Sequence, residues 1–227
     1  MTPRLTAALL VAAAVGTNAA FTVLGTVFNY PDVLADPGTD ILAAFRTSEA
    51  AIIAWFTVLA LAAALFAPIA VGVGRLSRHR VMRAAVPVGI AAAVVQVVGL
   101  SRWPILVPGY AARGDVDAFE TAHHVLGAIV GETLGYTLTA AWTVLVLIAL
   151  DRQLAGRWFT VLGGVSAVLI LSGVLVPLGV PGTDTANLAG YVLWSVWLVV
   201  FAVLLFRMRA PEGRAAAISG SGHRAAR

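Results

Sequence analysis

The sequence predicts an all-α integral membrane protein, a bundle of six transmembrane helices in an N-in, C-in topology. Of its 227 residues, 60% are hydrophobic and only 11% are charged, whereas a soluble domain usually carries about 25% charged residues on its surface. The same composition excludes a disordered chain, because such chains are poor in apolar residues. The sequence has no cysteine, which excludes disulfides, iron–sulfur clusters, thiolate zinc sites and thiol redox chemistry.

Six apolar segments are each long enough to cross the hydrocarbon core, which takes about 20 helical residues. They are continuously apolar and do not alternate every second residue, which argues against membrane-spanning strands. Short connections that contain Pro and Gly leave no room for a second folded domain. We expect one transmembrane domain, residues 1–210, and a disordered cytoplasmic tail, residues 211–227. The predicted spans are 5–28, 49–74, 84–108, 121–150, 158–179 and 187–206.

The first apolar segment has two interpretations. Residues 1–19 have the pattern of a signal peptide, with one arginine, a short apolar core and the small-residue site Thr17-Asn18-Ala19. The apolar run continues to Phe28, however, which is long enough to span. Charge placement does not decide, because five helices with an outer N-terminus would orient the others identically. We expect a retained first helix.

Arginine placement predicts the orientation of all the spans. With a cytoplasmic N-terminus, the inner side carries a net charge of +10 and the outer side −6, while Arg102 and Glu132 lie inside spans and cancel. The basic residues are distributed over every inner loop, where they hold the orientation and contact anionic lipid headgroups. The net charge of +4 therefore indicates membrane lipids as partners and no nucleic acid.

The second span is preceded by a turn, Asp36-Pro37-Gly38, after which Thr39 or Asp40 is the expected helix N-cap. The third span ends in Arg102-Trp103-Pro104. Counted at a rise of 1.5 Å per residue, Arg102 lies roughly 8 Å below the outer boundary, and Gln96 and Glu132 lie roughly 15 Å below it. A pair between Arg102 and Glu132 is feasible if the third and fourth helices are neighbours, which their short connection favours.

The fourth span carries two rows of residues. Glycines at 127, 131 and 135 favour close approach of another helix. On the adjoining flank, polar groups recur every four residues and so share one slowly turning face. That row consists of Glu120, His124, Ala128, Glu132 and Tyr136. The sixth span presents Asn187, Tyr191 and Ser195 on one face, with Trp194 beside them. Polar side chains therefore converge on the outer half of the bundle.

Each of these features also has a structural interpretation. Arg102 and Glu132 can form a buried ion pair that fixes helix register, or a ligand clamp, since ionisable residues in a membrane mark functional sites by default. His123 and His124 can bond to loop backbone; adjacent histidines point about 100° apart on a helix and no third ligand accompanies them. We expect no metal and no cofactor. Trp103 and Trp194 fit helix packing or a pocket wall. No sequence motif of a known catalytic class is present.

Four segments together resemble a bacterial family of small six-helix membrane proteins that is catalogued only as a domain of unknown function. The similarity runs over residues 5–207. It implies a multi-pass protein of the bacterial inner (plasma) membrane, and it supplies no activity, substrate or catalytic residue. The segments are Asn29-Tyr30-Pro31-Asp32, Arg102-Trp103-Pro104, Gly131-Glu132 with Gly135-Tyr136, and Ala186-Asn187 with Gly190-Tyr191 and Trp194.

The leading functional hypothesis is an outward-facing polar pocket that binds, senses or translocates a small amphiphilic or anionic molecule. Arg102 would anchor the anion and Glu132 would titrate a proton. One alternative is an intramembrane enzyme that uses Glu132 as general acid on a lipid or isoprenoid; another is a structural or assembly protein. The oligomeric state stays open. The predicted ligand-binding residues are Gln96, Arg102, Trp103, His124, Glu132, Tyr136, Asn187 and Tyr191.

Overall fold

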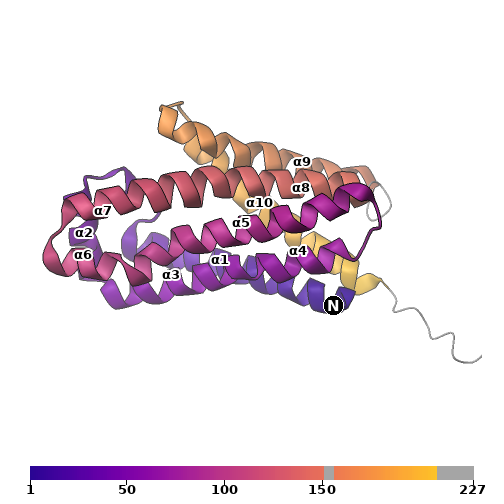
Figure 1. Cartoon of the computed structure of the whole chain (residues 1–227), viewed down its shortest axis with the longest axis horizontal. Coiled ribbons are helices and arrows are strands. Elements are labelled where there is room, and N and C mark those ends of the chain that lie inside the picture. The colour runs from indigo at the N-terminus through magenta and orange to yellow at the C-terminus, as the bar shows by residue number, and fades with distance from the viewer. Residues whose placement is uncertain (151–155, 209–227) are drawn as a thin grey trace, which may run out of the picture.

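The computed structural model describes residues 1–150 and 156–208, and every regular element in these residues is a helix (Figure 1). The predicted tail, residues 211–227, lies outside them. In chain order the elements are α1 (Pro3–Phe28), η1 (Asp32–Ala35), α2 (Gly38–Thr47), α3 (Glu49–Ala64), α4 (Phe66–Gly74), α5 (Arg80–Ile105), α6 (Val107–Arg113), α7 (Val116–Ala122), η2 (His123–Leu134), α8 (Gly135–Leu150), α9 (Gly156–Ser172), η4 (Gly173–Leu178) and α10 (Thr183–Arg207).

Consecutive elements combine into six helices that are long and apolar enough to cross a membrane, with mean hydropathies between 1.8 and 2.4. They confirm the six predicted spans: the second has the predicted bounds, and the structure lengthens or shifts the other five by a few residues. The largest difference is in the third span, because α6 continues α5 as far as Arg113. The spans are Pro3–Phe28, Glu49–Gly74, Arg80–Arg113, Val116–Leu150, Gly156–Leu178 and Thr183–Arg207.

The six spans form a ring in which each packs against the next in the chain and α10 returns to α1. At one end of the ring lie α2, α6 and α7, on the left in Figure 1, and we call it the α2 end. The N-terminus lies at the opposite end, together with the C-terminal end of α10 (Figure 1). A ring closed by its first and last helices leaves a central axis onto which side chains from different spans converge.

Two buried clusters fill this axis at different heights. Toward the N-terminal end, Trp142 and Trp197 are fully buried, and Trp197 stacks on Phe159 with ring centroids 5.1 Å apart. Toward the α2 end, Trp103 and Phe56 stack at 4.8 Å with nearly parallel rings. Five of the eight predicted ligand-binding residues lie between these two clusters.

The N-cap prediction for the second element is wrong. The helix α2 begins at Gly38, with Pro37 as its N-cap and no side chain bonded to its first turn. Proline fixes φ near its helical value, so the helix starts earlier than predicted. Thr39 and Asp40 then lie within the first turn. There, Thr39 Oγ1 donates to Asp40 Oδ1 over 3.2 Å. Gly38 also allows a close approach, because a Cβ there would lie 2.6 Å from Glu120 Oε1.

The two residue rows predicted for the fourth span presuppose a uniform α-helix. The structure shows that this span is not uniform. Residues His123–Leu134 form a π-helix, which continues into the regular helix α8. Thr133 Oγ1 accordingly donates to the carbonyl oxygen of Ala128, five residues back, over 2.9 Å. A π-helix bonds residues i and i+5 and is usually a single turn, often at a functional site. This segment is twelve residues long, so the side chains of the fourth span are displaced from the positions that α-helical spacing predicts.

Candidate ligand-binding cavity

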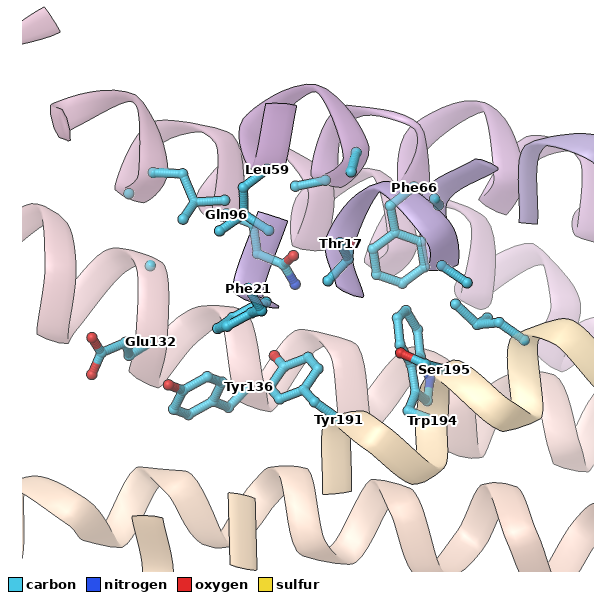
Figure 2. A pocket seen from close by; sticks show the side chains of 18 of the residues that line it. Thr17, Phe21, Leu59, Phe66, Gln96, Glu132, Tyr136, Tyr191, Trp194 and Ser195 are labelled. Carbon is cyan, nitrogen blue, oxygen red and sulfur yellow. The ribbon is translucent and has the colours of Figure 1, made fainter. Parts of the chain in front are cut away.

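A cavity of about 120 Å³ lies on the ring axis between the two buried clusters. A cavity needs about 10–15 Å³ to hold one buried water, so this space suits several waters or a small organic molecule. Side chains from α1, α3, α4, α5, η2, α8 and α10 line it, together with Tyr30 (Figure 2). Every span except the fifth therefore contributes to its wall. Its polar and aromatic lining consists of Thr17, Phe21, Tyr30, Phe66, Gln96, Arg102, Glu132, Tyr136, Tyr191, Trp194 and Ser195.

Five of the eight predicted ligand-binding residues line this cavity: Gln96, Arg102, Glu132, Tyr136 and Tyr191. They come from α5, η2, α8 and α10. Figure 2 shows Glu132, Tyr136, Tyr191 and Trp194 in succession along one side of the space, with Gln96 and Phe66 across from them. The structure thus brings together the carboxylate and the guanidinium that sequence analysis singled out.

The other three predicted residues lie elsewhere. Trp103 is fully buried in the cluster toward the α2 end. Asn187 is buried against α9, where its amide Nδ2 donates to the carbonyl oxygen of Ile170 over 2.7 Å. His124 is exposed on the surface of the π-helix. None of the three is among the residues that line the cavity.

Arg102 is buried without an acidic partner. It is only 4% exposed, and no carboxylate of the described residues lies within ion-pair distance of it. Nη1 donates to the carbonyl oxygen of Gly99 over 2.6 Å, Nη2 lies 3.5 Å from His123 Nδ1, and Nε has no partner. A guanidinium carries five N–H donors and stays charged, so part of its hydrogen-bonding capacity is unused among the described residues, and the Arg102 side chain is part of the cavity lining.

Glu132 shares the cavity with Arg102 but does not bond to it. Its side chain is partly buried, and within the described residues its carboxylate accepts no hydrogen bond. Figure 2 shows the hydroxyl of Tyr136 on the side of the ring that faces Glu132. The third and fourth spans are neighbours, as predicted, yet the feasible Arg102–Glu132 ion pair is not formed. A basic and an acidic side chain therefore line one cavity without a bond between them.

The glycine row of the fourth span makes room for α5. A Cβ on Gly99 would lie 2.6 Å from the Cα of Gly131, so the two backbones are in contact. A Cβ on Gly127 would lie 2.7 Å from Arg102 Nη2, and one on Gly135 would lie 3.3 Å from Gln96 Cγ. The predicted close approach of a second helix to this row is confirmed, and its consequence is space for the arginine and glutamine side chains.

Tyr30 is a cavity residue that sequence reasoning missed. The helix α1 ends at Phe28, and its C-cap Asn29 has a left-handed φ of 50° that turns the chain back over the bundle. The Tyr30 ring then packs between Phe21 and Phe56, at centroid distances of 5.5 and 5.1 Å. Burial raises the pKa of Tyr30 to about 12, so its phenol remains a neutral donor. The available signal was Asn29-Tyr30-Pro31, a turn sequence placed directly after a span.

His123 is the second omission. It is His123, and not the predicted His124, whose ring contacts Arg102. The ring of His123 stacks on Phe119 at a centroid distance of 5.6 Å, which places it between the guanidinium and the cluster at the α2 end. Two adjacent histidines point in different directions, and the sequence did not show which of them faces α5.

Hydrogen bonds between spans hold the cavity walls. Gln96 Nε2 donates to Thr139 Oγ1 over 2.8 Å and joins α5 to α8. Asn18 Nδ2 donates to Ser195 Oγ over 3.0 Å and joins α1 to α10. Trp194 Nε1 donates to the hydroxyl of Thr143 over 2.9 Å. The first and last spans are thus linked at the height of the cavity.

Metal ligation finds no support in the part of the chain that the structure describes, where no three His, Asp or Glu side chains gather as a metal ion would require. The donor set of the cavity is a guanidinium, a carboxylate, an amide and several hydroxyls. Such groups bind a polar or anionic ligand by hydrogen bonds and charge.

The comparisons with known proteins give the family and no activity. No curated protein and no solved structure matches the chain. A family model described as a domain of unknown function, DUF4386, matches residues 5–223, which extends beyond the resemblance expected over residues 5–207. Because this match covers nearly the whole chain, the six-helix protein belongs to the DUF4386 family.

Proposed function

We propose that the protein binds a small amphiphilic or anionic molecule in the cavity and senses or translocates it. The supporting observation is Arg102, a buried guanidinium with an unpartnered Nε and no carboxylate within ion-pair distance among the described residues. Leaving a buried charge unpaired is costly. An anionic group that entered the cavity would give the guanidinium a negatively charged hydrogen-bond acceptor, which the described residues do not provide.

The rest of the lining supports an amphiphilic ligand. Phe66 and Trp194 offer aromatic surface next to the cluster toward the N-terminal end, suited to an apolar body. Gln96, Tyr136 and Tyr191 offer donors and acceptors between the two regions. The proposal assigns no direct ligand contact to Trp103, His124 or Asn187, since these side chains lie outside the cavity.

The charge asymmetry supports a periplasm-facing site in the bacterial inner membrane. With an inner net charge of +10 and an outer net charge of −6 from the sequence, the N-terminus would be cytoplasmic and the α2 end would face outward. Arg102 and Tyr30 lie on the α2 side of the cavity. A ligand would then enter from the outer leaflet or the periplasm.

The test is mass spectrometry of the small molecules that co-purify with the solubilised protein, compared between the wild type and Arg102→Met. Methionine keeps an unbranched stem beside Gly127 and removes the charge. Arg113→Ala, on the same span, is the matched control because the Arg113 side chain packs on Tyr110 away from the cavity. We expect a species that is enriched in the wild type and the control and lost in Arg102→Met. An identical set of molecules in all three proteins would refute the proposal.

The enzyme alternative is less well supported than binding. General acid catalysis on an isoprenoid would use aromatic side chains to stabilise a developing positive charge. Trp103 was a candidate for this role, but it is enclosed in a packed cluster. A product whose formation disappears in Glu132→Gln while ligand binding survives would favour an enzyme. Flux of the co-purified molecule into liposomes would instead favour translocation.

A further inference from the structure

We infer that an anion enters the cavity together with one proton, which the Glu132 carboxylate takes up, so that the site binds a monoanion and H⁺ as a neutral pair. This inference rests on the proposed function and specifies how its site is regulated. The observation behind it is that Arg102 and Glu132 line one cavity without forming an ion pair. Both groups therefore remain available to a ligand and to solvent protons.

The net charge of the cavity lining explains why a proton would accompany the anion. With Arg102 positive and Glu132 negative, the cavity lining is neutral overall. A monoanion bound to Arg102 changes this sum to −1 and places two negative groups in one small space of low dielectric, where like charges repel strongly. Arginine does not lose its proton in proteins. Protonation of Glu132 restores neutrality: one O–H bond forms on the carboxylate as one O–H bond of a solvent hydronium ion breaks and leaves a water molecule.

The other groups that face Glu132 do not supply this proton balance. Tyr136 from α8 and Tyr191 from α10 line the cavity as phenols, and Tyr30 from the turn after α1 is a third. The His123 ring lies 3.5 Å from Arg102 Nη2, where the positive guanidinium would repel a second positive charge. The walls from α1, α3 and α4 contribute apolar side chains and Thr17. Among the described residues that line the cavity, Glu132 is the one carboxylate.

The experiment is calorimetric titration of the full-length solubilised protein with benzenesulfonate, which stays anionic at every pH used. Titrations in two buffers of different ionisation enthalpy give the number of protons taken up per anion. We expect about one proton per anion on the alkaline side of the Glu132 titration, and an affinity that falls about tenfold per pH unit there. Benzamide, a neutral molecule of similar size, is expected to bind without proton uptake.

Glu132→Gln removes the titrating group at almost unchanged volume. We expect this variant to bind benzenesulfonate with an affinity independent of pH and with no proton uptake. Glu49→Gln is the matched control, because Glu49 is an exposed acid at the start of α3, and it should keep the wild-type coupling. The proton count on the wild type tests the inference even if Glu132→Gln fails to fold.

The outcomes separate this inference from the proposed function. Binding of benzenesulfonate by the wild type without proton uptake would overturn the coupled proton and leave the anion site standing. Binding that depends on Na⁺ and not on pH would also overturn it, since a metal cation would then balance the charge. Failure of the wild type to bind benzenesulfonate at any pH would overturn the anion site itself.

Discussion

The two halves of the fourth span are one continuous helical rod with different packing. In the half toward the N-terminal end, α8, nine of sixteen residues are buried, and Trp142 meets Phe66 edge-to-face at 4.8 Å. In the half toward the α2 end, the π-helix His123–Leu134, only Gly127 of twelve residues is buried. Both halves pack against α5. The helix α5 therefore packs against a filled core in one half of the span. In the other half it borders a cavity lined by Arg102 and Glu132, which do not bond to each other.

The difference indicates a division of labour along the bundle. Interdigitated aromatic rings around Trp142 hold the spans together, because a dense interior gains dispersion contacts that a cavity forfeits. The π-helical half instead keeps glycines against α5 and leaves room for Arg102 and Gln96. Truncation of the buried aromatic side chain of α8 should therefore reduce mainly stability, and removal of the polar side chains beside the cavity should change mainly ligand binding.

The largest expected effect is that of Trp142→Ala. This ring is fully buried and contacts Phe66, Trp194 and Trp197, and truncation of such a residue costs about 3–5 kcal/mol. Chemical unfolding in detergent micelles measures the loss. Trp158→Ala is the control, because Trp158 is 55% exposed, and it should have little effect. Equal losses in the two variants would contradict the assignment of the stabilising core to the α8 half.

A smaller effect is expected from Gly99→Ala, which probes the contact between α5 and the π-helix. The added methyl group would press on the Gly131 backbone, and overpacking of this kind costs about 1–3 kcal/mol. The matched control is Gly164→Ala on α9, where no heavy atom lies within 4 Å of the added Cβ. That control should be neutral or slightly stabilised, by up to about 1 kcal/mol. A stability gain in Gly99→Ala would show that the two backbones are farther apart than described.

Thr139→Val and Thr143→Val test the hydrogen bonds that link α8 to the cavity wall. Each removes the acceptor of one interhelical bond, from Gln96 or from Trp194. Bonds of this kind in membranes contribute about 0.6–1.7 kcal/mol. We expect the smaller loss for Thr139→Val, since the freed Gln96 amide faces the cavity and can bond to water there. Double-mutant cycles with Gln96→Leu and Trp194→Phe measure the coupling energies, and a larger coupling at Gln96 would count against this order.

The smallest effects concern the two histidines of the π-helix. His123→Ala should weaken anion binding by up to about tenfold, because it removes one contact of the guanidinium worth at most about 1.5 kcal/mol. His124→Ala should leave both stability and binding unchanged, since that side chain is exposed. Calorimetric titration with benzenesulfonate measures both. A binding defect in His124→Ala alone would return that residue to the site and move His123 out of it.

The sequence predicted those cavity residues best whose side-chain type is rare inside a membrane span. Arg102, Glu132 and Gln96 stand out because charged and amide side chains are rare inside a span, and all three line the cavity. Trp103 was grouped with them because it is adjacent to Arg102, and Asn187 because helical spacing places it on one face with Tyr191 and Ser195. Trp103 instead packs on Phe56, and Asn187 bonds to the Ile170 carbonyl. A single sequence does not show how far each helix is rotated about its own axis.

What the sequence determined by itself is the six-span architecture and the identity of the charges inside it. Both follow from local physics: a helix crosses the membrane when enough consecutive residues are apolar, and a charge within it is conspicuous wherever the helix is placed. Only the tertiary structure decided the π-helical register of the fourth span, the choice of His123 over His124, the return of Tyr30 over the bundle and the separation of Arg102 from Glu132. These depend on contacts between residues far apart in the chain, such as those of α5 with the glycines of the fourth span and of Tyr30 with Phe56.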